Sequence, residues 1–384
     1  AIHADFGPAQ RARAVKENFA LGRALCSRFS RFLRFAGHIR EHRAMMRAAQ
    51  GVRTGMKAAV IGAGLAGAAA ARALRAAGLE PVLFDKGRGP GGRLSTRRAD
   101  TPCGEQRFDH GAQFVTASTA SFHGFLSQAA MAGAARVWDA RLVSIDRAGN
   151  AQPLRQAERF VGDPGMSALV KHALSDFDVR LSSRAVKLRG RPGAWKVHFE
   201  DASVEGPFER VALTLPPEQL IDFLARSDGD FADIITQANA AEIAPCWTVM
   251  AVLDAAFDSE FDGAKIYGGA IRWMARMGSR PARTTGEAVV IQASPDWSAA
   301  FLAAAPDFVA RQLCEEAYVR FAMPIPIWSS GHRWRYAMVT EPARSAFALS
   351  EGDTVGVAGD WRLGGKAEAA WTSGEALGQA LAAP

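Results

Sequence analysis

Three glycines at close spacing stand where a short apolar run gives way to a helix-forming one. They are Gly62, Gly64 and Gly67 in the stretch GAGLAG, preceded by KAAVI and followed by an alanine-rich run that closes at Gly78. In a dinucleotide-binding turn the first glycine allows the tight turn, the second lets the backbone approach a diphosphate, and the third allows close helix packing. The amino terminus of the helix then faces the phosphates. The spacing therefore predicts a dinucleotide site.

An acidic residue and a second glycine cluster follow the next apolar run. Asp85 lies 23 positions after Gly62, where a carboxylate can accept hydrogen bonds from ribose hydroxyls. The chain continues directly into GRGPGGR, which ends in Arg93. The first turn alone does not distinguish NAD from FAD, but a second loop with a guanidinium suits a larger ligand whose diphosphate needs a fixed cation. We expect the two loops to contact one ligand from two sides.

The elements that must position these loops follow from the same stretch. KAAVIGAG predicts a strand that ends in the turn, LAGAAAARALRAAG a helix, and LEPVLFDK a second strand. Strand, turn, helix and strand within about 30 residues form the context that makes the glycine spacing a dinucleotide fingerprint. Later in the chain, CWTVMAVL and EAVVIQAS predict strands, and PDFVARQLCEEAYVRFAMP predicts a helix that ends at Pro324.

Composition limits the class of protein. The chain has 384 residues, 48% hydrophobic and 22% charged, which is a globular composition that suits one large or two intimate domains. No apolar run approaches the roughly 20 residues needed to cross a bilayer, so we expect a soluble protein without a membrane partner. Cys26, Cys103, Cys246 and Cys314 lie far apart without a CxxC pair. This argues against a thiolate metal site and a disulfide framework, and it fits a reducing, cytoplasmic location.

The net charge of +7 is concentrated before Met56. That segment has eleven Lys and Arg against three Asp and Glu, or +8, which leaves −1 for everything from Met56 onward. Residues 1–55 could be a basic binding arm or an organelle-type presequence, because they are Arg-rich and acid-poor. Since Met56 directly precedes the first predicted strand, we instead expect an over-extended start or a poorly packed leader that is non-native or disordered. We do not expect a nucleic-acid partner.

Several motifs in fixed order carry a resemblance to a known family. The stretches GAGLAG, FDKGRGPGGRLSTRR and FDHGAQFVT, followed by MPIPIWSSGHRWRYA and GVAGDWRLGGKAEAAWTSGEALG, resemble the flavin-dependent amine oxidase superfamily, and specifically its bacterial renalase-like branch. The resemblance runs from about Met56 to the carboxyl terminus. It implies that FAD is the cofactor. Because no cysteine follows Cys314 and Trp361 stands next to the Gly-Asp pair, we expect the FAD to be bound non-covalently.

The resemblance assigns residues to parts of FAD. It implies that the first turn binds the diphosphate, Asp85 and Lys86 the adenosine ribose, and Val186 the adenine through its backbone. It also implies that Gly359 and Asp360 bind the second phosphate and ribityl chain, and that the helix starting near Lys366 points its positive end at the flavin. The complete predicted FAD-binding set is Gly62, Gly64, Ala66, Gly67, Asp85, Lys86, Gly92, Arg93, Ala112, Gln113, Val186, Gly359, Asp360 and Ala367.

The substrate side offers rings rather than an acid or base. Hydride transfer to flavin requires mainly that the donor carbon be held against the ring, so no catalytic triad and no metal are expected. Trp273, Arg276 and several other aromatic residues lie in stretches that resemble the family. Each aromatic residue, taken alone, could equally be part of the core. The predicted substrate-pocket candidates are Gln113, Trp297, His332, Trp334 and Trp361. Together they would form a flat slot for a nicotinamide-sized ring.

The predicted fold is α/β: a Rossmann-type FAD-binding domain with an inserted α+β substrate domain, in a p-hydroxybenzoate hydroxylase-like or amine oxidase-like architecture. We expect the FAD-binding domain to be assembled from residues 56–112, 154–217 and 333–384. Residues 113–153 and 218–332 are expected to form the substrate domain, and residues 1–55 the basic leader.

The resemblance also implies a reaction. Renalase-like enzymes oxidise misreduced dihydro-NAD(P) isomers to NAD(P) and pass the electrons to oxygen as hydrogen peroxide, so the expected partners are a dihydropyridine and O2. The same fold also hosts amine oxidation and desaturase-like reactions on other small substrates, which stay open as alternatives. A flavin-binding protein without turnover is a third interpretation. Neither the preferred isomer, the choice of NAD or NADP, nor the oligomeric state follows from the residues.

Overall fold

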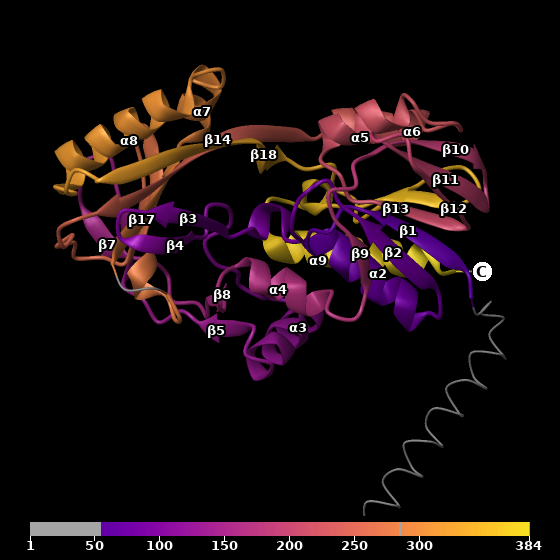
Figure 1. Ribbon diagram of the computed structural model, residues 1–384, viewed down its shortest axis with the longest axis horizontal. Coiled ribbons are helices and arrows are strands. Elements are labelled where there is room, and N and C mark those ends of the chain that lie inside the picture. Colours follow the sequence, from indigo (N-terminus) through magenta and orange to yellow (C-terminus); the bar gives the residue numbers. More distant parts are fainter. Residues whose placement is uncertain (1–54, 284–285, 384) are drawn as a thin grey trace, which may run out of the picture. The chain divides into compact units, whose positions relative to one another are not determined.

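The structure is a computed structural model that describes residues 55–283 and 286–383. The predicted basic leader, except for its last residue, lies outside the described residues, as does Cys26. Elements are labelled as in Figure 1.

A six-stranded sheet carries the two glycine loops. Its order is β19 (Ala348–Leu349), β20 (Val355–Val357), β13 (Arg210–Leu213), β1 (Lys57–Ile61), β2 (Glu80–Phe84) and β9 (Asp178–Arg180). All neighbours run parallel except β19, which is antiparallel to β20. The helix α2 (Leu65–Ala76) connects β1 to β2. The strand, helix and strand predicted around the first glycine turn are thus confirmed.

Both faces of this sheet are buried (Figure 1). Ala58 and Val60 of β1 belong to a core shared with α2, α4 (Ser167–Ala173) and α9 (Ala367–Leu381). Ala59 and Ile61 belong to a second core, shared with the antiparallel strands β10 (Ala185–Arg191), β11 (Ala194–Phe199) and β12 (Val204–Phe208) and with α5 (Pro217–Leu224) and α6 (Ala232–Asn239). A near-continuous apolar strand such as β1 is what a parallel sheet covered on both faces requires.

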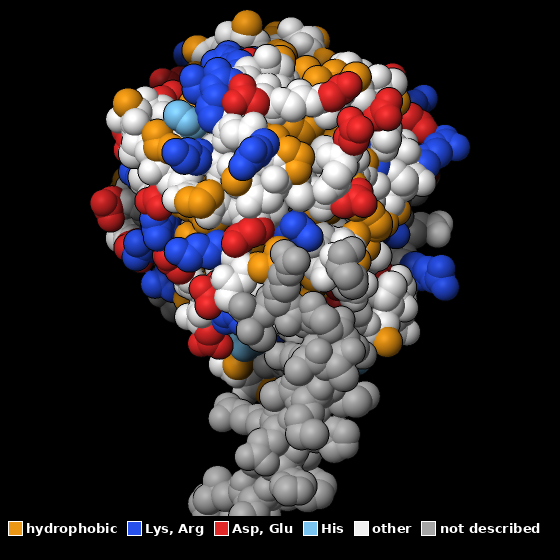
Figure 2. Space-filling view, turned by 90° about the vertical axis from the view of Figure 1, so that its right-hand side faces the viewer, with side chains coloured by type: hydrophobic (Ala, Val, Ile, Leu, Met, Phe, Trp, Pro, Cys, Tyr) orange, Lys and Arg blue, Asp and Glu red, His pale blue; other side chains and the backbone are white. Residues whose placement is uncertain are grey.

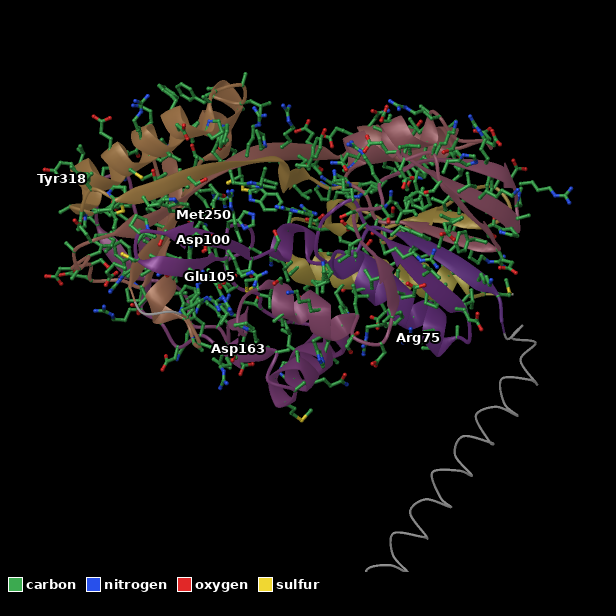
Figure 3. The ribbon with its side chains drawn as sticks, viewed as in Figure 1. Arg75, Asp100, Glu105, Asp163, Met250 and Tyr318 are labelled. Atoms are coloured by element: carbon green, nitrogen blue, oxygen red, sulfur yellow. The ribbon has the colours of Figure 1, made fainter. Side chains whose placement is uncertain are left out.

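A seven-stranded sheet forms the other main layer. Its order is β18 (Trp328–Glu341), β14 (Glu242–Leu253), β17 (Glu287–Ala293), β16 (Ile271–Arg276), β15 (Gly263–Ile266), β6 (Leu142–Ile145) and β7 (Ala151–Pro153). The helices α7 (Pro295–Ala300) and α8 (Pro306–Phe321) cover one face, where Val249 and Leu313 share a core. Met250 lies within this sheet and Tyr318 on α8 (Figure 3); Met250 is fully buried, whereas Tyr318 is 55% exposed. The two strands and the helix predicted here are confirmed.

The remaining elements connect the two sheets. The hairpin β3 (Arg97–Thr101) and β4 (Gly104–Phe108) carries Asp100 and Glu105 (Figure 3). The chain then forms α3 (Ala120–Met131) and the pair β5 (Ala135–Val137) and β8 (Phe160–Gly162). Short 3-10 turns η1 (Gly92–Leu94), η2 (Met277–Ser279) and η3 (Asp360–Arg362) lie at loop ends.

The predicted domain ranges divide some of these elements. The boundary at residue 333 falls inside β18, which begins at Trp328 and pairs with β14 along its length. Residues 218–239 were expected in the substrate domain, but α5 and α6 pack in the core beneath the six-stranded sheet. Both differences arise because strand pairing and helix packing join residues that no local signal connects. The ranges themselves stay a prediction.

Charges are intermixed on the face at the β10–β12 end of the described chain. Acidic and basic side chains alternate there between apolar ones (Figure 2). Within residues 55–283 and 286–383, no helix combines the length and apolarity that a bilayer crossing needs.

Candidate functional site

A cleft of about 1390 Å³ is lined by residues from both sheets. It runs past the carboxyl ends of β1 and β2, where parallel α/β sheets commonly bind ligands. Thirteen of the fourteen predicted FAD-binding residues line it, and the exception is Gly67. The structure therefore brings together residues that are up to about 300 positions apart in the chain. The thirteen are Gly62, Gly64, Ala66, Asp85, Lys86, Gly92, Arg93, Ala112, Gln113, Val186, Gly359, Asp360 and Ala367.

The three glycines of the first turn have different geometries. Gly62 has a φ of +112°, a conformation that favours glycine. A Cβ on Gly67 would lie 1.9 Å from the carbonyl oxygen of Gly62, so this glycine allows α2 to pack on the end of β1. A Cβ on Gly64 would meet only the Cα of Gly92, at 4.0 Å. The backbone at Gly64 is therefore open to the cleft, and no side chain caps the amino terminus of α2 that follows it.

Asp85 holds the two glycine loops together. Its Oδ2 accepts a hydrogen bond from the Ala63 N–H (2.7 Å), and its Oδ1 accepts one from the Gly87 N–H (2.6 Å). The Gly91 N–H in turn donates to the Ala63 carbonyl oxygen (3.0 Å). Each carboxylate oxygen keeps a lone pair for another donor, because it accepts only one of these bonds. The second loop thus lies directly against the first, while their expected contact with one ligand from two sides stays a prediction.

Arg93 connects the second loop to distant parts of the chain. Its guanidinium donates to the Ala337 carbonyl oxygen of β18 (3.1 Å) and forms an ion pair with Asp360. Its own carbonyl oxygen accepts from the Ala112 N–H (2.8 Å). The sequence placed Arg93 and Asp360 separately beside a diphosphate, and the structure shows that they contact each other.

Two close helix contacts align α9 with α2. A Cβ on Gly374 would lie 2.0 Å from the Ala66 carbonyl oxygen, and one on Gly378 would lie 2.5 Å from that of Ala70. Only glycine allows this approach. As a result, the amino-terminal residues of both helices line the same cleft, including Ala66 of α2 and Ala367 of α9. The positive ends of two helix dipoles favour anionic groups at this place.

Glu368 fixes the start of α9 to the loop before α3. Its carboxylate accepts from the N–H groups of Ser118 (2.8 Å) and Thr119 (2.6 Å) and from their hydroxyls (2.7 and 2.9 Å). Burial alone would raise the pKa of Glu368, but these hydrogen bonds lower it to about 2. Because Ser118 and Glu368 are 250 positions apart, no local sequence pattern predicts this contact.

We expect Glu368→Gln to lower the thermal midpoint by about 1–3 °C at neutral pH. Because the pKa of Glu368 is lower in the folded state, its ionised carboxylate stabilises the fold at pH values above the ordinary pKa of 4.5. This stabilisation is lost as the pH falls to about 2. The difference in midpoint between parent and variant should therefore shrink over this interval in a pH series of thermal melts. Glu260→Gln, at an exposed carboxylate, is the control. A difference that stays constant with pH would contradict this role.

Aromatic rings form one wall of the cleft. His332 on β18, Gln292 on β17 and Trp273 on β16 lie level with one another across the sheet, with Thr248 of β14 between the first two. The rings of His332 and Trp334 are 4.6 Å apart, and the Trp334 indole N–H donates to the His110 carbonyl oxygen (2.9 Å). Trp273, His332 and Trp334 all line the cleft, so a flat ring has apolar faces to pack against.

Burial disfavours the charged form of two imidazoles, His332 at this wall and His110 behind it. Burial, followed by the charges of His332 and Arg97, lowers the pKa of His110 to about 3. Burial and Arg97 also lower the pKa of His332. The rings of His110 and His332 lie 4.7 Å apart, edge to face. The wall therefore presents rings without added positive charge from histidine.

Gln113 is held by hydrogen bonds on both ends of its amide. Its Nε2 donates to the carbonyl oxygens of Asp109 (2.6 Å) and Gly111 (3.0 Å). Its Oε1 accepts from the Trp273 indole (3.2 Å) and from Arg280 (2.7 Å). Both amide hydrogens and both oxygen lone pairs are thereby used. Gln113 lines the cleft as a fixed part of its wall.

A buried charge cluster supports Gln113 from behind. The carboxylate of Asp109, fully buried, forms ion pairs with Arg280 (2.8 Å) and with Arg283, and accepts from the Thr96 hydroxyl (2.7 Å). Burial alone would raise the pKa of Asp109, but the two guanidiniums and the hydrogen bonds from Met166 and Thr96 lower it below its ordinary value. Burial lowers the pKa of Arg280 to about 10. No sequence pattern revealed this cluster, although Asp109 lies in FDHGAQFVT, one of the stretches that carry the family resemblance.

The comparisons with known proteins agree with this geometry. A family model described as an NAD(P)-binding Rossmann-like domain matches residues 60–128. Cyclohexylamine oxidase from Brevibacterium oxydans IH-35A is similar with a TM-score of 0.68 at 12% sequence identity, over 85% of this chain and 98% of that chain. The chain has the fold of this oxidase. The predicted α/β class with a Rossmann-type domain and an amine oxidase-like architecture is therefore confirmed.

Two further solved structures share this fold. Putrescine oxidase bound to putrescine has a TM-score of 0.63 at 13% identity, covering 84% of this chain and 98% of that chain. A candidate protoporphyrinogen oxidase from Exiguobacterium sp. 255-15 has a TM-score of 0.65 at 11% identity, covering 85% and 98%.

Three of the side chains expected at the slot are held elsewhere: those of the candidates Trp297 and Trp361, and that of Arg276. Trp297 of α7 does not line the cleft and stacks near Phe301, with ring centroids 4.5 Å apart, against the core under the seven-stranded sheet. Arg276 is also outside the lining and pairs with Glu287 (2.7 Å). Trp361 borders the cleft but is 1% exposed, and its indole donates to the Leu215 carbonyl oxygen (3.1 Å). Packing of these side chains in the core or in a local ion pair explains their positions.

Proposed function

We propose that this chain is an FAD-dependent oxidoreductase. The observation that carries the proposal is the open cradle at Gly64 and Gly92, where two glycine loops and the amino termini of α2 and α9 meet in one cleft without side chains filling the gap between them. A Cβ at Gly64 would have only one backbone atom within 4 Å, so a diphosphate has room to approach. The polar groups fit FAD: backbone N–H groups and Arg93 can donate to a diphosphate, and the Asp85 carboxylate can accept from ribose hydroxyls.

In this proposal each part of the chain has one binding role. The turn at Gly62, Gly64 and Ala66, together with Gly92 and Arg93, holds the diphosphate. Asp85 and Lys86 lie at the adenosine ribose, and the backbone of Val186 lies at the adenine. Gly359 and Asp360 hold the second phosphate and ribityl chain, while Ala112, Gln113 and Ala367 border the flavin. Non-covalent attachment predicts that denaturation with acid releases all of the flavin.

We further propose the renalase-like reaction, oxidation of misreduced dihydro-NAD(P) isomers to NAD(P). Bound FAD would supply the hydride acceptor and return its electrons to oxygen as hydrogen peroxide. The chain would contribute a rigid slot in which Trp273, His332 and Trp334 hold a dihydropyridine ring flat. Hydride loss from such a ring restores an aromatic pyridinium and needs no proton transfer, which suits a wall of neutral rings without an acid or base.

Amine oxidation is the second candidate. It is supported by the fold shared with cyclohexylamine oxidase and putrescine oxidase. The same cofactor cradle would serve both reactions, so only the substrate half of the cleft distinguishes them.

Anaerobic absorbance of the purified full chain tests the proposal. The protein should be yellow, and borohydride-made dihydro-NAD isomers should bleach it quickly, whereas ordinary NADH and simple amines should not. Air should then restore the colour with release of hydrogen peroxide. Bleaching by amines alone would favour the second candidate, and bleaching by no reductant would favour a flavin-binding protein without turnover. A colourless protein that takes up no FAD would refute the cofactor assignment.

A further inference from the structure

Charge is unevenly distributed over the two halves of the cleft. All four carboxylates in its lining, Asp85, Glu200, Asp222 and Asp360, lie on the side of the six-stranded sheet or its covering elements. The opposite side, made of the seven-stranded sheet and the loop 154–159, contributes six cations and no carboxylate. We call these six residues the basic wall: Arg155, Arg159, Lys265, Arg272, Arg333 and Arg335.

The carboxylates of the cleft all form hydrogen bonds or ion pairs within the protein. Asp85 accepts from two backbone N–H groups, and Asp360 pairs with Arg93. Glu200 lies 3.6 Å from Arg184, and Asp222 lies 2.7 Å from Arg226. In the part of the chain that the structure describes, no residue of the basic wall forms an ion pair. No carboxylate of the described residues therefore pairs with its positive charge.

Some of these cations contact neighbouring protein groups: Arg159 donates to the Arg155 carbonyl oxygen (2.7 Å), and the Lys265 ammonium lies 4.8 Å from the centroid of the Tyr267 ring. Arg333 donates to the Leu302 carbonyl oxygen (2.5 Å) and stacks on Trp247, with its guanidinium carbon 5.5 Å from the ring centroid. Lys265 and Trp273 are directly paired on β15 and β16, and Arg272 precedes Trp273 in β16. The backbones of Lys265 and Arg272 therefore lie next to that of Trp273, and both residues line the cleft.

The basic wall is separate from the corner where the glycine loops meet. Arg93 reaches β18 at Ala337, and Arg335 and Arg333 come two and four residues earlier on that strand. At about 3.4 Å per residue, their Cα atoms lie about 7 and 14 Å from that of Ala337. A cleft of about 1390 Å³ also exceeds the roughly 300–1,000 Å³ of a site for one drug-sized ligand. The lining of the cleft thus extends beyond the glycine loops to the basic wall.

We propose that the basic wall is a subsite for the diphosphate of the substrate, so that the enzyme selects phosphate-bearing substrates over cationic amines. Unpaired Arg and Lys side chains in a partly enclosed cleft attract phosphate and repel an ammonium group. This inference rests on the proposed function and deepens it. It names the group that the substrate must carry besides its reacting ring, and it assigns Lys265 and Arg272 as specificity-determining residues.

The test separates this inference from the redox chemistry by using a ligand that cannot be oxidised. ADP-ribose carries the diphosphate without a nicotinamide, and its binding to the FAD-loaded full chain can be followed by calorimetry while absorbance confirms that FAD stays bound. Lys265→Gln/Arg272→Gln should weaken ADP-ribose binding about tenfold, as expected for the loss of two partly exposed charge contacts. Lys196→Gln/Arg311→Gln removes the same two residue types at exposed positions outside the cleft and should change the affinity less than twofold.

Steady-state kinetics provide the second measurement. In the cleft variant, KM for dihydro-NAD isomers should rise about tenfold at unchanged kcat, because the diphosphate contributes equally to ground-state and transition-state binding. The corresponding isomers of N-methyl dihydronicotinamide, which lack phosphates, should show the same kinetics with parent and variant. A cleft variant that affects both substrates equally would overturn the inference.

The possible failures are distinguishable. Weaker ADP-ribose binding in the cleft variant alone supports the subsite even if no dihydropyridine is oxidised, in which case only the proposed reaction fails. Equal ADP-ribose affinity in parent and cleft variant, or none in the parent, overturns the subsite even if dihydropyridines are oxidised. Should the variant fail to fold, salt titration of the parent decides: affinity that does not fall between about 50 and about 500 mM NaCl overturns the inference.

Discussion

Replacing Asp109 by asparagine will lower the free energy of unfolding by about 3–5 kcal/mol, the usual cost of removing one partner from a buried ion pair. The variant leaves Arg280 and Arg283 without a countercharge, and their side chains are 0% and 2% exposed. The shape of the side chain is nearly unchanged, so the loss reflects charge rather than a cavity. Chemical denaturation at pH 7 measures the difference.

The pH dependence of stability tests whether the lost charge of Asp109 is the cause. Because the pKa of Asp109 is lowered in the folded state, its ionised carboxylate contributes to stability at pH values above the ordinary pKa of 3.8. This contribution is lost as the pH falls below that value. The difference between parent and Asp109→Asn should therefore narrow in denaturation curves below that pH. Asp100→Asn, on the exposed hairpin strand β3 (Figure 3), should stay within about 0.5 kcal/mol of the parent. A similar loss in both variants would mean that the buried cluster is not responsible.

The second large effect is expected at Gly64, where a valine should abolish FAD binding without unfolding the protein. Gly64 has a φ of −87°, which any residue can adopt, and a Cβ there would have only the Gly92 Cα nearby, at 4.0 Å. The added side chain would instead occupy the open cradle proposed for the diphosphate. We expect FAD affinity to fall at least about 100-fold, or about 2.7 kcal/mol.

Flavin content and circular dichroism together measure this outcome. The Gly64→Val variant should purify colourless with the secondary structure of the parent. Gly89→Val is the matched control, since Gly89 lies in the second glycine loop, has nothing within 4 Å of a Cβ and does not line the cleft. It should remain yellow. Normal FAD affinity in Gly64→Val would exclude this turn as the diphosphate site.

Local patterns were sufficient wherever the relevant residues are close in the chain. The spacing of Gly62, Gly64 and Gly67 predicts β1, α2 and the start of β2, because each glycine answers a steric requirement of the same short turn. The end of α8 before Pro324 is predicted for the same reason, since proline cannot continue a helix. The family resemblance then extended the predicted site to Gly359 and Asp360, which do line the cleft.

Contacts between segments far apart in the chain were decided by the tertiary structure alone. The Arg93 and Asp360 side chains pair across 267 positions, and Asp109 pairs with Arg280 across 171. The basic wall exists only because strand register places Lys265 beside Trp273 and strand order brings β18 to the same cleft. Conversely, Trp297 has the residue type expected of a slot but packs against the core instead. The sequence by itself determined the cofactor loops, whose geometry is local. Pairing and charge balance across the cleft depend on the register and packing of whole sheets, which no short stretch encodes.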